Sequence, residues 1–176
     1  MKIVGINGSP RNNGNSEWAL SFLNGKCSQF AEMSCYHLSK TSINQCNGCL
    51  ICEDNKPCPF NDDMDKIAKS LIESDIILFV TPVYFDNVTS VLKNFIDRTN
   101  TLGNQLSGKK AVVVTFGQAD DVSWRAVISY LKNYFDIMGV EMILSCSYYA
   151  RRIGDAKNDK RIVDSLTELS NKIKDI

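Results

Sequence analysis

The sequence predicts an α/β fold in which a five-stranded parallel sheet is covered by helices on both faces. Short apolar runs rich in β-branched residues alternate with segments whose apolar residues recur at helical spacing. The chain has 176 residues, 44% of them hydrophobic, with 20 basic and 20 acidic side chains. This length and composition predict one globular domain over residues 1–176, large enough to bury a sizeable core.

The expected strands are apolar runs with β-branched or aromatic residues. They span Lys2 to Ile6, Glu32 to Leu38, Ile76 to Thr81, Lys110 to Phe116 and Glu141 to Tyr149. Because a helical pattern separates each strand from the next, the connections are those of a parallel sheet. Five such units fit the flavodoxin-like strand order 2-1-3-4-5.

The expected helices are marked by apolar residues that return every three or four positions. Their core-facing stripes are Ala19, Phe22, Leu23, Cys27 and Phe30; Met64, Ile67, Ala68, Leu71 and Ile72; Val88, Val91, Leu92, Phe95 and Ile96; Val127, Leu131, Phe135 and Met138, ended by Gly139; and Ile162, Leu166, Leu169 and Ile173. One long irregular stretch remains, Ser39 to Phe60, between the second strand and the second helix. A loop of this length usually has a function.

The segment Gly5 to Ser16, which joins the first strand to the first helix, has the composition of a phosphate site. Backbone N–H groups and the dipole at a helix N-terminus favour an anion. The supporting groups are Ser9, Asn15 and Ser16 for hydrogen bonds, Gly8 and Gly14 for a tight turn, and Arg11 for a charge-assisted contact. The spacing matches neither the dinucleotide fingerprint nor the Walker loop, which favours a terminal monophosphate. The alternative is a Gly/Asn-rich turn that only caps the helix.

Four of the seven cysteines form a C-x-x-C-x-x-C-x5-C run: Cys46, Cys49, Cys52 and Cys58, followed by Pro59. Three thiolates at steps of three can converge on one cluster, and the fourth can come from beyond a short loop, as in ferredoxin-type iron–sulfur ligation. Bacterial ferredoxins share the Cys-Pro ending but space the last pair differently. In a reducing cytosol, clustered thiols are more often metal ligands or redox groups than disulfides.

Three other interpretations of these cysteines stay open. Zinc sites commonly pair two separated C-x-x-C knuckles, and C-x-x-C pairs can also act as redox thiols. A plain structural role is the third, although loop residues surround the four positions. Cys27, Cys35 and Cys146 follow the apolar periodicity of their elements, so packing explains them.

Several segments together resemble the iron–sulfur flavoproteins, within the broader NADPH-dependent FMN reductase group with a flavodoxin-like fold. They are Gly-Ser-Pro-Arg-x-x-Gly-Asn-Ser at 8–16, the cysteine run, Asp62-Asp63-Met64, and Thr81-Pro82-Val83-Tyr84-Phe85 followed by Leu92-Lys93-x-Phe95-Ile96-Asp97-Arg98. The resemblance implies FMN binding, because these segments follow strands at the sheet edge where doubly wound folds bind ligands. Asp62 and Asp63 also open the second helix, where carboxylates cap and complement the dipole.

The resemblance also implies which residues hold FMN. Ser9, Arg11, Asn13, Asn15 and Ser16, with the Gly14 backbone, would hold the phosphate, and Thr81, Pro82, Val83, Tyr84 and Phe85 the isoalloxazine. Pro82 fixes the exit from the third strand and leaves the following backbone groups available to the ring. Tyr84 and Phe85 can pack on its faces, with core packing as the alternative. Gly117 permits close approach, and Phe116 stands where many relatives have a second glycine.

The expected function is electron transfer between FMN and a 4Fe-4S cluster held by the four clustered cysteines, with NAD(P)H or ferredoxin as donor. No catalytic side chain is named, since flavin N5 accepts hydride directly. The alternatives are an NAD(P)H-dependent FMN or quinone reductase without a cluster and a non-enzymatic electron carrier. Arg151 and Arg152 belong to a solvated loop, to a site for the phosphates of a nicotinamide nucleotide or to a contact with another subunit.

The expected partners are small-molecule or protein electron donors and acceptors. Scattered basic residues at zero net charge give no footprint for nucleic acid. No membrane span or signal peptide is visible, which predicts a cytoplasmic protein. The resemblance implies a homodimer or homotetramer with the flavin near the subunit boundary.

Overall fold

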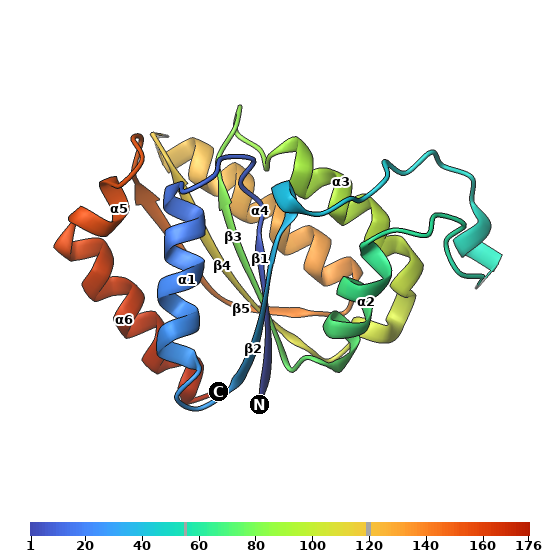
Figure 1. Ribbon diagram of the computed structural model, residues 1–176, viewed down its shortest axis with the longest axis horizontal. Helices are drawn as coiled ribbons and strands as arrows, with labels where there is room; N and C mark the ends of the chain where they lie inside the picture. The colour runs from blue at the N-terminus through green and yellow to red at the C-terminus, as the bar shows by residue number, and fades with distance from the viewer. Residues whose placement is uncertain (55, 119–120) are drawn as a thin grey trace.

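A parallel sheet with the predicted order β2-β1-β3-β4-β5 forms the centre of the computed structural model, which describes residues 1–54, 56–118 and 121–176 (Figure 1). The strands are β1 (Lys2–Asn7), β2 (Glu32–His37), β3 (Ile76–Pro82), β4 (Lys110–Gly117) and β5 (Glu141–Tyr149). No strand end differs from its expected position by more than one residue. The predicted flavodoxin-like fold is confirmed.

Helices cover both faces of this sheet. They are α1 (Asn15–Cys27), α2 (Met64–Glu73), α3 (Ser90–Arg98), α4 (Asp121–Ile137), α5 (Asp155–Asn158) and α6 (Lys160–Lys174). Helices α1, α5 and α6 pack on one face, and α2, α3 and α4 on the other (Figure 1). Within the described ranges, no helix has the length and apolar composition that a membrane crossing requires.

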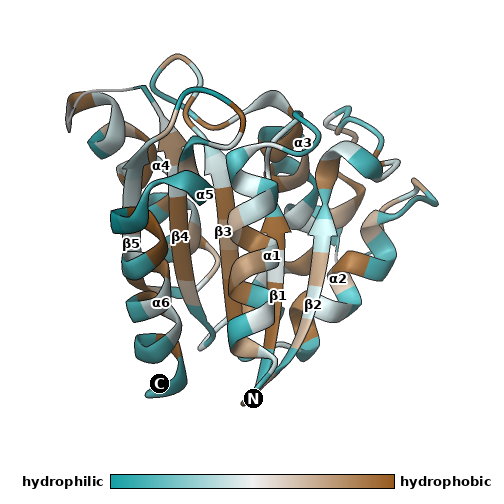
Figure 2. Ribbon diagram, turned by 60° about the vertical axis from the view of Figure 1, so that its left-hand side comes forward, coloured by the Kyte–Doolittle hydropathy of each residue, from teal (hydrophilic) through white to brown (hydrophobic). Residues whose placement is uncertain are grey.

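The core consists of two layers separated by the sheet, because successive residues of a strand point to opposite faces. In β3, Ile77 and Phe79 pack toward α2, α3 and α4, whereas Ile76, Leu78 and Val80 pack toward α1 and α6. Figure 2 shows β1, β3 and β4 as the most hydrophobic strands. A strand covered on both faces needs this continuous apolar composition.

The predicted helical stripes are largely buried, with a few differences at their margins. Phe22, Ala68 and Val91 are half-buried, as is Phe30, which lies beyond the end of α1. Ile72 is exposed, so its assignment to the core was wrong. Its position directly after buried Leu71 turns it to the flank of α2, where it lines an open groove beside residues 100–105.

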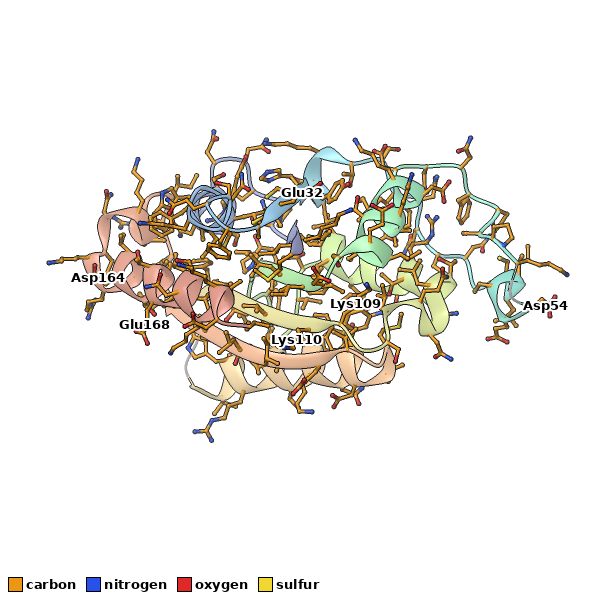
Figure 3. The ribbon with its side chains drawn as sticks, turned by 90° about the horizontal axis from the view of Figure 1, so that it is seen from below. Glu32, Asp54, Lys109, Lys110, Asp164 and Glu168 are labelled. Atoms are coloured by element: carbon orange, nitrogen blue, oxygen red, sulfur yellow. The ribbon has the colours of Figure 1, made fainter. Side chains whose placement is uncertain are left out.

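The predicted irregular stretch leaves the sheet after β2 and projects beyond α2 and α3 (Figure 1). It includes two short 3-10 helices that the sequence did not predict, η1 (Leu38–Lys40) and η2 (Ile51–Asp54). A third, η3 (Thr99–Leu106), follows α3 directly. Figure 3 shows Asp54 at the outer end of the loop, away from the helices that cover the sheet.

The start of α3 is bonded to the loop that follows β1. The Thr89 hydroxyl accepts a hydrogen bond from the Leu92 N–H at 3.2 Å, capping the helix, and donates to the Gly8 carbonyl at 2.5 Å. The Gly8 N–H donates to the Val80 carbonyl of β3 at 2.9 Å. A Cβ at Gly8 would lie 2.9 Å from the Leu92 side chain and 3.0 Å from the Thr81 hydroxyl, so glycine is required here.

We expect Thr89→Val to lower the free energy of unfolding by about 1 to 3 kcal/mol, because it removes a helix cap and leaves a buried carbonyl without its donor. Urea denaturation measures this. Thr167→Val is the matched control, since the Thr167 hydroxyl donates to the Val163 carbonyl one turn back on α6. This variant should change the free energy of unfolding by less than about 0.5 kcal/mol. Equal stability of the two variants would contradict the role of Thr89.

Candidate functional site

A cavity of about 670 Å³ lies at the carboxyl ends of the strands, between the loops that follow β1, β3, β4 and β5. Most of the residues predicted to hold the cofactor line it: Ser9, Arg11, Gly14, Asn15, Ser16, Pro82, Val83, Tyr84, Phe116 and Gly117. The loop after β1 (residues 5–16, the phosphate loop), predicted to bind the phosphate, and the segment after β3, predicted to bind the isoalloxazine, therefore line the same cavity. Its volume is in the range of small-molecule and cofactor sites.

The phosphate loop presents the N-terminus of α1 to this cavity. Gly14 is the N-cap residue and offers no side chain to cap the helix, so the first N–H groups of α1 can meet an anion. Ser9 and Ser16 are buried, and the Ser9 hydroxyl accepts a hydrogen bond from the Arg11 N–H at 3.1 Å. This arrangement combines backbone donors, hydroxyls and one guanidinium at the end of a helix of 13 residues.

The side chain of Asn15 has a different task from the one expected. Its Nδ2 donates to the carbonyls of Ala150 at 3.3 Å and Arg152 at 3.0 Å, and its Oδ1 accepts from the Ala156 N–H at 3.2 Å. Asn15 therefore ties α1 to the loop after β5. Its backbone N–H, rather than its amide side chain, is the group that can face a phosphate.

Three predicted cofactor residues do not line the cavity. Asn13 is exposed, and its N–H donates to the Glu17 carboxylate at 2.6 Å, with a positive φ of 54°. Thr81 is completely buried, and its hydroxyl donates to the Pro82 carbonyl at 3.2 Å. Phe85 is fully exposed on the tip of a turn.

That turn follows β3 and has an unusual backbone. Tyr84 and Asn87 exchange hydrogen bonds of 2.9 and 3.0 Å, and between them Phe85 and Asp86 have φ values of 47° and 58°. Positive φ at both central residues is the type I′ turn, which is usually built from Asn and Gly. The Asp86 carboxylate accepts a hydrogen bond from the Ser123 hydroxyl of α4. Core packing is therefore excluded as the reason for Phe85 at this position.

The end of β4 contributes backbone atoms to the cavity wall, because the ring of Phe116 packs elsewhere. Phe116 is buried, and its ring packs on Tyr148 with centroids 5.5 Å apart. Its carbonyl accepts the Val83 N–H at 2.8 Å. A Cβ on Gly117 would lie 3.3 Å from Trp124 and 3.4 Å from Val83, so the cavity wall is already tightly packed here.

The role of the loop after β5 is open from the sequence, and the structure brings this loop to the cavity. Ala150, Arg151, Arg152 and Ile153 line one side, and Arg11 Nη1 donates to the Arg151 carbonyl at 3.3 Å. The available signal was the position of this loop at the carboxyl end of a strand. It was weak because β5 is an edge strand, whose following loop can equally face solvent.

The four clustered cysteines line a second, smaller cavity of about 70 Å³. All four are free thiols; Cys46 and Cys49 are exposed, and Cys52 and Cys58 are half-buried. Its walls include Pro59, Phe60, Arg98 and Asn100. The described part of the chain contains no group of three or more His, Cys, Asp or Glu side chains arranged to hold a metal ion. The thiols thus share one cavity without converging on one point.

A buried ion pair fastens this loop to α3. Arg98 Nη1 and Nη2 donate to the Asp62 carboxylate at 2.7 and 3.2 Å, and the two side chains are only 1% and 3% exposed. Nη1 also donates to the Asn44 carbonyl at 2.7 Å, and the guanidinium lies 5.0 Å above the Phe60 ring. The sequence predicted a helix-capping role for Asp62, and its carboxylate does accept the Met64 N–H at 3.1 Å.

This environment shifts both ionisation equilibria toward the charged forms. Burial alone would raise the pKa of Asp62, but hydrogen bonds from Arg98, Asn44 and Met64 outweigh it and lower the pKa from 3.8 to about 2. Burial would likewise lower the pKa of Arg98, yet the hydrogen bond and charge of Asp62, with a smaller contribution from Cys58, raise it. Both groups are therefore charged at neutral pH.

We expect Asp62→Asn to lower the free energy of unfolding at pH 7 by about 3 to 5 kcal/mol, because it leaves a buried guanidinium without its partner. The pKa of Asp62 is lower in the folded state than in the unfolded state. The Asp62–Arg98 pair therefore stabilises the fold above about pH 4, and this stabilisation is lost as the pH falls toward 2. The variant should therefore lose less stability than the wild type across that interval, as measured by denaturation at several pH values.

Asp136→Asn is the matched control, since Asp136 pairs with Lys132 on the exposed surface of α4. Its effect should stay below about 0.5 kcal/mol. A similar loss in both variants would contradict the structural importance of the buried pair.

The comparisons with known proteins agree with this geometry. The sequence matches the family described as NADPH-dependent FMN reductase over residues 1–153. An iron-sulfur flavoprotein of Methanocaldococcus jannaschii is 30% identical over all of this chain and 97% of its own, and one of Methanosarcina thermophila is 26% identical over 100% and 95%. The structure of the Trp repressor binding protein from Bacillus subtilis superimposes with a TM-score of 0.72, at 25% identity, covering 95% of this chain and 99% of that one.

Proposed function

The chain belongs to the iron–sulfur flavoproteins of the NADPH-dependent FMN reductase family and is an FMN-dependent oxidoreductase, and we propose that it transfers electrons between FMN and a 4Fe-4S cluster. The observation that carries the proposal is the single cavity lined by Cys46, Cys49, Cys52 and Cys58. Four thiolates are the complete ligand set of such a cluster. Neither a purely structural role nor a role for single thiols explains why four cysteines line the same cavity.

FMN would occupy the cavity at the strand ends. Its phosphate would bind at the N-terminus of α1, with Ser9, Ser16 and Arg11 as further donors. The isoalloxazine would lie along Pro82 to Tyr84, with Gly117 opposite. Bound FMN supplies the redox chemistry, since a flavin can exchange one or two electrons. The residues of this chain bind it, orient it and limit the access of water.

The cysteine loop fits a cluster by the chemistry of its donors and walls. Besides the four thiols, the cavity has the apolar wall of Phe60 and Pro59 and the buried guanidinium of Arg98, whose charge is paired with Asp62. A cluster favours this combination of low polarity and nearby N–H donors.

A homodimer or homotetramer in the cytoplasm is part of the same proposal. The support is Phe85, whose aromatic ring is fully exposed beside the flavin cavity on a turn with two residues at positive φ. Each such residue costs on the order of 1 kcal/mol or more. A second subunit would cover this ring and complete the enclosure of the flavin.

A second candidate is an NAD(P)H-dependent FMN or quinone reductase that carries no cluster. It is favoured by Arg151 and Arg152 at the rim of the flavin cavity, where guanidinium groups suit the phosphates of a nicotinamide nucleotide. This candidate predicts steady oxidation of NAD(P)H by metal-free protein. The first candidate predicts that electrons leave the flavin singly through the cluster.

Anaerobic purification followed by metal, sulfide and flavin analysis tests the cluster. We expect about four iron and four sulfide per chain together with FMN. Cys49→Ser should lose iron and sulfide but keep FMN, whereas Cys146→Ser, which changes a half-buried cysteine outside the loop, should keep all three. Zinc, or FMN without any metal, would overturn the cluster and leave the second candidate.

Arg11→Gln tests the phosphate site, because it removes the guanidinium but leaves the helix N-terminus intact. We expect the Kd for FMN to rise about 10- to 100-fold, the value of a hydrogen bond to a charged group. The Kd for riboflavin, which has no phosphate, should not change. Flavin fluorescence titration measures both, and Arg161→Gln on the exposed surface of α6 is the control. An equal loss for the two flavins would contradict a phosphate contact.

A further inference from the structure

Two side-chain N–H groups at the junction of α3 and η3 lie at the thiol cavity. Asn100 Nδ2 donates a hydrogen bond to Cys52 Sγ at 3.2 Å. Arg98 Nε is buried, and among the described residues none accepts a hydrogen bond from it. Both side chains line the cavity together with the four thiols.

The free Nε–H is the stronger of the two observations. The Nη groups of Arg98 are engaged by Asp62 and the Asn44 carbonyl, which fixes the plane of the guanidinium. A buried donor without an acceptor costs about 1 to 3 kcal/mol. A buried donor of this kind in a native protein calls for an explanation, and a ligand that accepts its hydrogen bond when bound is one. Arg98 and Cys58 both line the thiol cavity.

We infer that Asn100 and Arg98 are positioning residues that donate N–H···S hydrogen bonds to the Cys52 and Cys58 thiolates of the bound cluster and raise its reduction potential. This inference rests on the proposed function. The proposed transfer would move one electron from reduced FMN to the cluster, with no bond formed or broken. Because that electron increases the negative charge on the sulfurs, N–H donors stabilise the reduced form more than the oxidised form.

Asn100→Leu tests the first donor, since leucine has a similar shape but no N–H, and the side chain of Asn100 is exposed. The anaerobically purified holoprotein is titrated electrochemically while the reduced cluster is followed by electron paramagnetic resonance. At a fixed potential we expect about a tenfold lower ratio of reduced to oxidised cluster, a downward shift of about 59 mV for a one-electron couple. Asn104→Leu is the matched control, an exposed asparagine on the same helix η3.

Arg98 is tested without substitution, because its replacement would also break the buried ion pair. Wild-type protein is grown with arginine labelled with ¹⁵N only at Nε, and the reduced cluster is examined by electron–nuclear double resonance. A ¹⁵N coupling is expected that unlabelled protein lacks. Its absence would overturn the assignment of Arg98.

The outcomes separate this inference from the function on which it rests. Wild-type protein without iron and sulfide would overturn both. A cluster-containing wild type whose Asn100→Leu and Asn104→Leu variants have the same potential would overturn the inference alone. A lower potential only in Asn100→Leu, with unchanged iron and FMN content, supports it against a merely structural role.

Discussion

The parallel order of the sheet is the constraint on which the rest of the molecule depends. Strands β1 and β3 are neighbours, yet the helices that follow them, α1 and α3, pack on opposite faces. Their loops therefore separate and leave a crevice at the carboxyl edge, where doubly wound folds bind ligands. The cavity at the strand ends opens there because of this topology, and the residues of the loops decide what it binds.

The same constraint explains which polar residues are buried. Strands covered on both faces must be apolar along their length, so polar side chains collect at the strand ends. Asn7, Thr81 and Thr115 occupy such positions in β1, β3 and β4, and all three are almost fully buried. Asn7 Oδ1 accepts the Ser9 N–H at 3.0 Å, and the Thr115 hydroxyl donates to Ser147 at 2.8 Å. The first bond shapes the loop after β1, and the second joins the neighbouring strands β4 and β5.

The sheet and its order could be predicted because their signals are local, since periodicity reveals which face of an element is buried. The composition of one short loop likewise predicts an anion site, which stays a prediction. The use of the Asn15 side chain could not be predicted, since its partners lie more than 130 residues away. The pairing of Asp62 with Arg98 depends in the same way on how α3 meets the loop. The exposed turn at Phe85 could not be predicted either, because turns with positive φ at both central residues usually contain Asn and Gly, and an aromatic residue after a strand fits core packing equally well.

The cysteine loop is held at its base and not by a core of its own. The Ser42 N–H donates to the Asp63 carboxylate at 2.7 Å and the Asp63 N–H to the Ser42 carbonyl at 3.1 Å, while the Asn44 N–H donates to Asp62 at 2.8 Å. The two ends of the loop are thereby joined. Only the intervening segment must be ordered when a ligand binds, which limits the entropic cost of assembling four thiols.

Helix α3 connects the two cavities, which share no lining residue. Thr89, which caps the helix, is hydrogen-bonded to Gly8 in the loop after β1. At the other end of the helix, Arg98 is paired with Asp62, just after the cysteine-containing stretch of residues 39–60. Nine residues at about 1.5 Å each give roughly 13 Å between these anchors. Because Leu92 and Phe95 bury the helix against the sheet, its position is fixed. The separation of the loop after β1 from the segment that carries Asp62 is therefore set by the length of one packed helix.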